Sequence, residues 1–300
     1  MRRALILCLL STIVLVGCGA GDTVSLDQVA NAAAATGKYS GVRIDMTTTT
    51  SVPGIPGAIT TTSAGVVDSR IKRGRMTIDM TDVRREAMSG IKGAAKRVGP
   101  PEAWRGEMVL DFSKGRLVAY LRMPFMTRLM KTSKPWVKFD YQRLGEQAGI
   151  DFQQFTTLGG SNPAQAVDYL RAVSGKVEAR GHETVRGVET THYHGTIDLQ
   201  KYPNLVPPGR RDEMSKTIDQ LIKLAGVRTI PADVWIGDDH LVRKMQYSYT
   251  MRIKDQRTGR RQPRKMDLTM ELYDFGATVA VALPPAGQVF DLATLIEKSG

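Results

Sequence analysis

The chain of 300 residues carries 42 Lys or Arg against 30 Asp or Glu, a formal net charge of +12, and has two cysteines, Cys8 and Cys18. At this length a core can form without covalent cross-links, and two cysteines exclude a disulfide-dense scaffold. The positive charge suits an anionic membrane surface or nucleic acid. The basic clusters at 70–75, 84–97 and 257–265 contain few of the aromatic residues on which single-stranded nucleic acid stacks. We therefore expect solvated loops there, or contacts with lipid headgroups, and no nucleic-acid partner.

The first eighteen residues have the pattern of an export signal. A basic head is followed by roughly a dozen mostly apolar residues, fewer than the ~20 that a permanent membrane helix needs. Leu15-Val16-Gly17-Cys18 then resembles the bacterial lipobox, in which the thiol receives a diacylglyceryl group and cleavage leaves cysteine first. The alternative is a buried cysteine in an ordinary signal anchor. We expect residues 1–17 to be a lipoprotein signal peptide and residues 18–26 a lipidated tether.

This interpretation has consequences for location and redox state. Two acyl chains, of the palmitate type, hold a protein firmly on a membrane. We therefore expect an exported protein, anchored through Cys18 to the outer face of the cytoplasmic membrane. Because Cys8 leaves with the signal and Cys18 is capped, the mature chain has neither a free thiol nor a disulfide, and its charge is about +10.

Apolar residues alternate with polar ones along most of the remaining chain, after a first Ala-rich helix predicted over 26–37. The alternation predicts strands over 42–47, 76–81, 245–251 and 266–272, each with one apolar face. A sheet with one covered face has this pattern.

Two further helices and two loops interrupt the strands. A helix over 162–174 is predicted from Pro163 just inside an Asn cap, and one over 210–226 from apolar residues at helical spacing. Residues 90–106, rich in Gly, Pro and basic side chains, predict a mobile loop, and 254–264 a long basic hairpin loop. The elements together predict an α+β fold in one domain over 27–298.

The best candidates for chemistry are His192 and His194. Two residues apart in a strand, they share a face and could chelate a metal. Tyr193 and Ile197, of opposite parity, favour a solvated face for the histidines, and no third ligand is evident. The mature sequence also has no nucleophile elbow, usable cysteine or phosphate-binding loop. We therefore expect no metal, no cofactor and no enzymatic activity.

Thirteen methionines follow Met1, many of them on the apolar faces of strands. Methionine is flexible, so it serves either as core filler or as the lining of a cavity for ligands of varied shape. Residues 123–131 combine Met, Phe and Leu with a proline between two predicted strands, either as ordinary core or as a loop guarding an apolar cavity. The candidate cavity residues by strand parity are Met46, Met76, Ile78, Met80, Met108, Leu121, Met123, Phe125, Met126, Met130, Tyr247, Tyr249, Met251 and Met270.

Four stretches, at 134–140, 187–199, 230–245 and 274–292, resemble the LppX/LprG-type lipoproteins of actinobacteria and, more distantly, the LolA/LolB carriers. This resemblance implies a strongly curved antiparallel half-barrel with helices covering its concave face. The apolar space between them would take acyl chains, a lipid, a lipoglycan or another lipidated molecule.

We therefore expect a monomeric lipid carrier or chaperone at the cell envelope. The alternative is a surface-tethered sensor that uses the same fold to bind a protein partner or a wall polymer.

Overall fold

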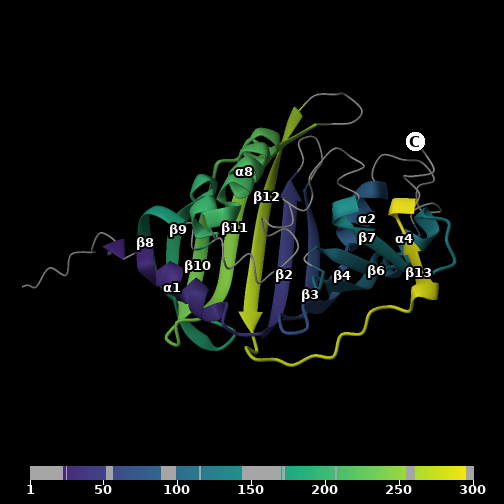
Figure 1. Cartoon of the computed structure of the whole chain (residues 1–300), viewed down its shortest axis with the longest axis horizontal. Coiled ribbons are helices and arrows are strands. Elements are labelled where there is room, and N and C mark those ends of the chain that lie inside the picture. The colour runs from purple at the N-terminus through teal and green to yellow at the C-terminus, as the bar shows by residue number, and fades with distance from the viewer. Residues whose placement is uncertain are drawn as a thin grey trace, which may run out of the picture.

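The computed structural model describes residues 23–24, 26–51, 57–88, 99–114, 116–143, 170, 173–206, 208–254 and 261–294. Thirteen strands in these ranges form one sheet in the order β1-β8-β9-β10-β11-β12-β2-β3-β4-β5-β6-β7-β13 (Figure 1). The strands are β1 (Thr23–Val24), β2 (Gly41–Ser51), β3 (Ala58–Asp68), β4 (Arg73–Asp79), β5 (Arg105–Asp111), β6 (Val118–Arg122), β7 (Trp136–Asp140), β8 (Val173–Val185), β9 (Val188–Asp198), β10 (Thr229–Gly237), β11 (Val242–Lys254), β12 (Arg261–Tyr273) and β13 (Val289–Asp291).

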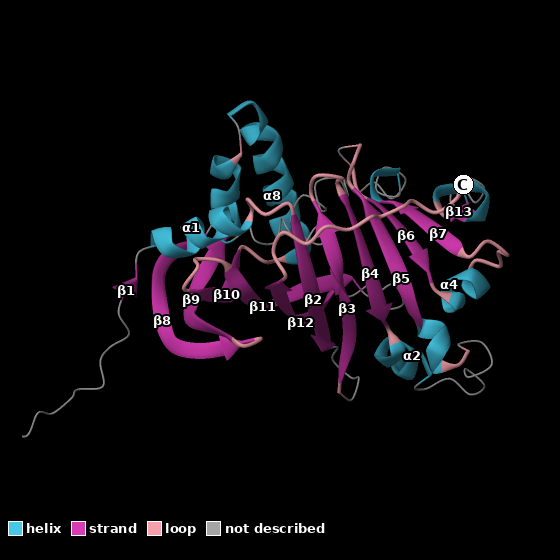
Figure 2. Cartoon of the chain, turned by 90° about the horizontal axis from the view of Figure 1, so that it is seen from below, coloured by secondary structure: helices cyan, strands magenta, loops and turns pink. Residues whose placement is uncertain are grey.

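The sheet is open, with β1 and β13 at its two ends, and every pairing is antiparallel except the parallel pair β13–β7. It is also strongly curved: β8 bends sharply (Figure 2). The β8–β9 turn consequently reaches back to β12 and β2, where Arg186 pairs with Glu271 at 2.7 Å and with Asp45. Positive φ at Arg186 and Gly187 fits the type I′ turn of a tight hairpin.

The α-helices are α1 (Leu26–Thr36), α2 (Thr81–Met88), α4 (Pro124–Leu129) and α8 (Arg211–Ala225), and the 3₁₀ helices are η1 (Pro101–Trp104), η4 (Leu199–Leu205), η5 (Pro208–Arg210) and η6 (Ala286–Gln288). Helices α1 and α8 lie on the same side of the sheet, over β8 to β11 (Figures 1 and 2). We call the face they cover the inner face. None of the helices in the described ranges is long and apolar enough to cross a membrane.

The spacing of buried residues explains how α1 docks. Val29, Ala32, Ala33 and Thr36 follow one helical stripe and are all buried. The Thr36 hydroxyl donates to the Ala32 carbonyl at 2.7 Å and accepts from the Val242 amide at 2.9 Å, so it joins the helix to β11.

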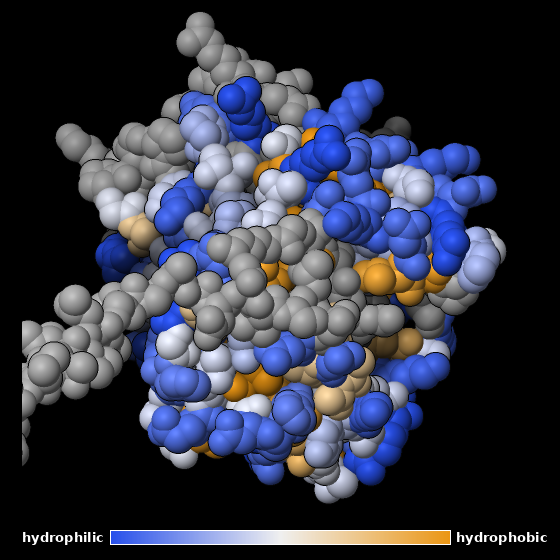
Figure 3. Space-filling model, turned by 90° about the vertical axis from the view of Figure 1, so that its left-hand side faces the viewer, coloured by the Kyte–Doolittle hydropathy of each residue, from blue (hydrophilic) through white to orange (hydrophobic). Residues whose placement is uncertain are grey.

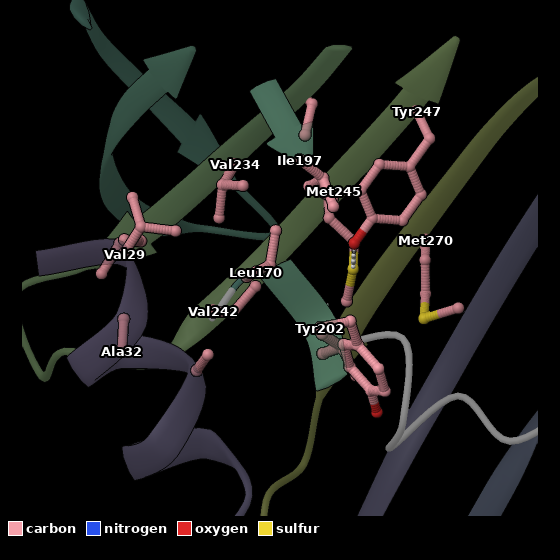
Figure 4. Close-up of a cluster of buried hydrophobic side chains, with 14 of the residues drawn as sticks. Val29, Ala32, Leu170, Ile197, Tyr202, Val234, Val242, Met245, Tyr247 and Met270 are labelled. Carbon is pink, nitrogen blue, oxygen red and sulfur yellow. Dashed lines mark hydrogen bonds between the residues drawn. The ribbon is translucent and has the colours of Figure 1, made fainter. Parts of the chain in front are cut away.

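The main core lies between these helices and the inner face (Figure 4). A second cluster lies on the inner face of β4 to β6, around Met76 and Leu110. A third lies on the opposite, outer face, where Val281 of the segment between β12 and β13 packs against Val109 and Trp136. The predicted fold class, an α+β strongly curved antiparallel half-barrel with helices on one face, is confirmed.

The helices predicted over 26–37 and 210–226 are confirmed as α1 and α8, and the strands over 42–47, 245–251 and 266–272 as parts of β2, β11 and β12. The strand over 76–81 was too long. Asp79 Oδ1 accepts from the Thr81 amide at 2.9 Å, which turns the chain into α2 before the alternation ends.

The boundaries of the helix predicted over 162–174 and of the loop predicted over 90–106 were wrong in part. Of the helix over 162–174, residues 162–169 and 171–172 lie outside the described ranges, and Val173 and Ser174 belong to β8. Of the loop over 90–106, residues 90–98 lie outside, and 101–106 form η1 and the start of β5.

The hairpin loop over 254–264 is shorter than predicted, because Lys254 already pairs with Arg261. Pro263 is tolerated in β12 because the pairing with β2 begins only at Lys265.

Candidate functional site: the inner face of the sheet

Strand register arranges the apolar residues of the inner face into rows that cross the sheet. The central row runs from β9 to β5 through directly paired positions: Tyr193, Val234, Met245, Met270, Met46, Ser63, Ile78 and Gly106. Three predicted cavity residues, Met46, Ile78 and Met270, therefore share one line of side chains.

Coverage of the central row is uneven. Val234, Met245 and Met270 are at most 2% exposed and belong to the core beneath α1 and α8. Met46 and Ile78, further along the row, are only half-buried. The row thus continues as apolar surface beyond the part that the helices fill.

The second row runs parallel to it, through Leu272, Ile44, Gly65, Met76, Met108, Leu121 and Val137. Gly65 has no side chain and so leaves a gap in this row. The position requires glycine, because a Cβ there would lie 2.1 Å from the Arg75 carbonyl oxygen. Met76 is buried, whereas Met108 and Leu121 are half-buried. The partly open region therefore extends from β2 to β6.

The two predicted tyrosines lie on the same face of β11 as Met245. Tyr247 is buried, and its hydroxyl donates to the Met245 sulfur at 3.0 Å (Figure 4). Burial raises the pKa of the Tyr247 phenol, and also that of Tyr249, which packs at the border of the core. The backbone of Met251 continues β11, but its side chain lies outside the described part of the structure.

The remaining candidates form a separate group around α4, where a helix replaces the predicted loop. Pro124 starts the helix, as proline does at a first helical position, and Phe125 stacks on Trp104 with ring centroids 3.6 Å apart. Met123 is 1% exposed, and Met126 and Met130 are half-buried. Met80 is half-buried between β4 and α2, and its amide donates to the Trp104 carbonyl at 3.0 Å.

Sequence reasoning missed the polar members of the inner face. In the third row, Tyr247 and Leu268 continue into Thr48 and Thr61. Ser63 stands in the central row between Met46 and Ile78. Residues 47–51 of β2 and 60–63 of β3 are runs of Thr and Ser, so alternation could not assign the faces of these two segments. The register between the two strands assigns them, because Met46 pairs with Ser63 and Thr48 with Thr61.

His192 and His194 lie on the opposite, outer face, as their parity predicts, and the sequence could not show that Asp233 lies between them. Its Oδ1 is 2.8 Å from His192 Nε2 and 2.9 Å from His194 Nδ1, and His192 stacks on Trp235. No group of three or more His, Cys, Asp or Glu side chains among the described residues is arranged to hold a metal ion.

The rest of the outer face is held by ion pairs between neighbouring strands. Glu107 joins Arg75 and Arg122, and Asp79 pairs with Arg105 at 2.7 Å. Seen from the β8 end, the described surface is mainly hydrophilic with small apolar areas between charged side chains (Figure 3).

No protein-family model matches the chain. It is similar to a 31.2 kDa protein of Streptomyces griseus described as uncharacterized, with 28% identity over 172 residues, which is 56% of this chain and 51% of that protein. It is also similar to the putative lipoprotein SCO4650 of Streptomyces coelicolor, with 26% identity over 169 residues, which is 55% of this chain and 45% of that protein. The chain thus spans about half the length of the curated relatives it matches.

Similar solved structures include the lipoprotein LppX of Mycobacterium tuberculosis, at 15% identity and a TM-score of 0.47, covering 86% of this chain and 97% of that one. LppX is one of the lipoproteins that the sequence was predicted to resemble, and the resemblance is confirmed to this extent.

Proposed function

We propose that this protein is an exported lipoprotein that binds a lipid or lipidated molecule against the inner face of its sheet and acts as a carrier or chaperone at the cell envelope. One observation carries the proposal. The central and second rows of the inner face continue over β2 to β6 with half-buried apolar side chains, beyond the region that α1 and α8 cover. The protein acts by binding rather than by catalysis, as a monomer.

The chemistry of these side chains suits acyl chains. Each buried methylene contributes about 0.8 kcal/mol, so about ten methylenes supply roughly 8 kcal/mol, enough to offset much of the entropic cost of association. Methionines at positions 46 and 108 adapt to chains of different length and unsaturation because they are flexible.

The anchor is part of the same proposal. The resemblance of Leu15–Cys18 to the lipobox supports lipidation of Cys18 and attachment to the outer face of the cytoplasmic membrane, and a relative's name, putative lipoprotein, agrees. Leu26, the start of α1, lies eight positions after Cys18, a reach of under about 30 Å. The inner face would then stay within reach of lipid headgroups.

The test is lipid co-purification. Residues 19–300, purified from bacterial cells without the anchor, are examined by native mass spectrometry and lipid extraction. Near-stoichiometric lipid supports the carrier. A bare protein that takes up no fluorescent acyl probe would refute it and favour the sensor, with Cys18 only holding a binding surface at the membrane.

A matched pair of variants locates the lipid. Ile78→Trp fills the half-buried part of the central row, whereas Thr77→Trp places the same indole on the outer face of the same strand. Lipid should be lost from Ile78→Trp and kept by Thr77→Trp. Equal loss from both would show that the lipid does not lie on the inner face.

A further inference from the structure

Ser63 is a buried hydroxyl without a partner. The residue is 7% exposed, and its Oγ makes no hydrogen bond to any described residue. Buried polar groups are almost always hydrogen-bonded, so an unpaired one calls for an explanation.

Among the residues that the structure describes, the surroundings of Ser63 supply no hydrogen-bond partner. Met46 and Ile78 lie directly opposite it on the two neighbouring strands, and Gly65 follows on the same face of β3. Because β3 is paired on both sides, its backbone amides and carbonyls already serve the sheet. The hydroxyl therefore has no hydrogen-bond partner among the described residues. Its direct neighbours on both adjacent strands are apolar, Thr61 precedes it on the same face of β3, and it lies at the border between the filled and the partly open parts of the inner face.

We propose that the Ser63 hydroxyl donates a hydrogen bond to an acyl carbonyl oxygen of the bound lipid; this inference rests on the proposed function. The acyl chain then lies over Ile78, Met108 and Leu121, on the side of Ser63 away from α1 and α8.

The carbonyl is a neutral ester or amide rather than a free carboxylate. A buried carboxylate needs a charged partner, and the residues paired with Ser63 in the central row are uncharged. The ligand class is therefore an esterified or amidated lipid, not a free fatty acid.

Two fluorescent glycerolipids test this on the full chain carrying Cys18→Ser, which has no anchor lipid of its own. One probe bears two acyl esters, and the other two ether-linked chains of equal length without carbonyls. Wild-type Ser63 should bind the ester about tenfold more tightly, a difference of about 1.4 kcal/mol. The Ser63→Ala variant should lose this preference, while its affinity for the ether probe stays unchanged. The Ser63→Thr variant, which keeps a hydroxyl, should keep part of the preference.

Two controls separate a ligand contact from a structural role. Thr62→Ala removes a hydroxyl from the adjacent residue on the outer face and should keep the preference for the ester. Without ligand, Ser63→Ala should be at least as heat-stable as wild type, because it removes an unsatisfied group. A clear loss of stability would show that the hydroxyl has a partner within the fold, and would overturn the inference.

The failures are distinguishable. If the wild type binds neither probe, the proposed function fails and the inference fails with it. If it binds both equally, or if Ser63→Ala keeps the ester preference, the assignment of Ser63 is wrong and the carrier stands. If free oleate binds more tightly than its methyl ester, the conclusion that Ser63 contacts a neutral ester or amide carbonyl is wrong.

Discussion

The uneven coverage of the central row predicts a gradient of stability along it. Met270, 1% exposed, is part of the core beneath the helices, whereas its direct partner Met46 is half-buried. Truncating a fully buried methionine removes its transfer free energy and leaves a cavity, so Met270→Ala should cost about 3 kcal/mol, within the ~2–5 kcal/mol seen for such changes. Met46→Ala removes less buried surface and should cost about 1 kcal/mol.

Urea unfolding followed by circular dichroism measures the two losses, with Met270→Leu as a volume-conserving control that should stay under about 1.5 kcal/mol. In thermal unfolding, Met270→Ala should lower Tm by roughly 6–12 °C, at ~2–4 °C per kcal/mol. Equal losses for the two alanine variants would refute the reasoning, because both residues would then lie in one filled core. Lipid uptake should follow the opposite order, falling more for Met46→Ala.

Three further changes test the frame that holds the inner face. Gly65→Ala should prevent folding or shift β3 from β4, since its Cβ would lie 2.1 Å from the Arg75 carbonyl oxygen, and loss of the native circular-dichroism spectrum would report this. Asp68 accepts from the Arg70 guanidinium at 2.7 and 3.1 Å, and these bonds lower the pKa of its carboxyl. Its stabilisation should be full above the unfolded pKa of about 3.9 and be lost as pH falls through the lower folded value, so Asp68→Asn should lower Tm at pH 7 by more than at pH 2. Arg186→Ala should cost under about 1 kcal/mol, because its ion pairs with Asp45 and Glu271 are partly exposed, and a larger loss in urea unfolding would show that the bent hairpin depends on them.

Alternation in the sequence was sufficient to predict the strands over 42–47, 245–251 and 266–272, and most of the strand over 76–81. It could not predict α2 or α4, because these short helices depend on a local bond, from Thr81 to Asp79, and on the placement of Pro124. The strand order was also inaccessible, since β2 pairs with β12, more than 200 residues away in the chain. Ser63 escaped notice because Thr and Ser occupy both faces of β3, and a hydroxyl is marked as unpartnered only by its neighbours in space.

The two halves of the sheet are closed by different parts of the chain, and this difference bears on where a ligand fits. Over β8 to β11, helices α1 and α8 cover the inner face. Over β4 to β7, the segment after β12 covers the outer face instead. Val281 of this segment packs against Val109 and Trp136, and the Arg73 guanidinium donates to the Val281 carbonyl at 3.1 Å.

The segment after β12 starts at a close backbone contact, where the Gly276 amide donates to the Gly41 carbonyl at 2.8 Å and a Cβ on Gly41 would lie 1.7 Å from the Ala277 oxygen. With its outer face closed in this way, β5 places Val109 and Leu110, both nearly fully buried, on opposite faces, while Met108 on the inner face stays half-buried. A strand that is apolar on both faces needs cover on both. Lipid bound over Met108 and Leu121 would supply the part of that cover which neither the helices nor the C-terminal segment provides among the described residues.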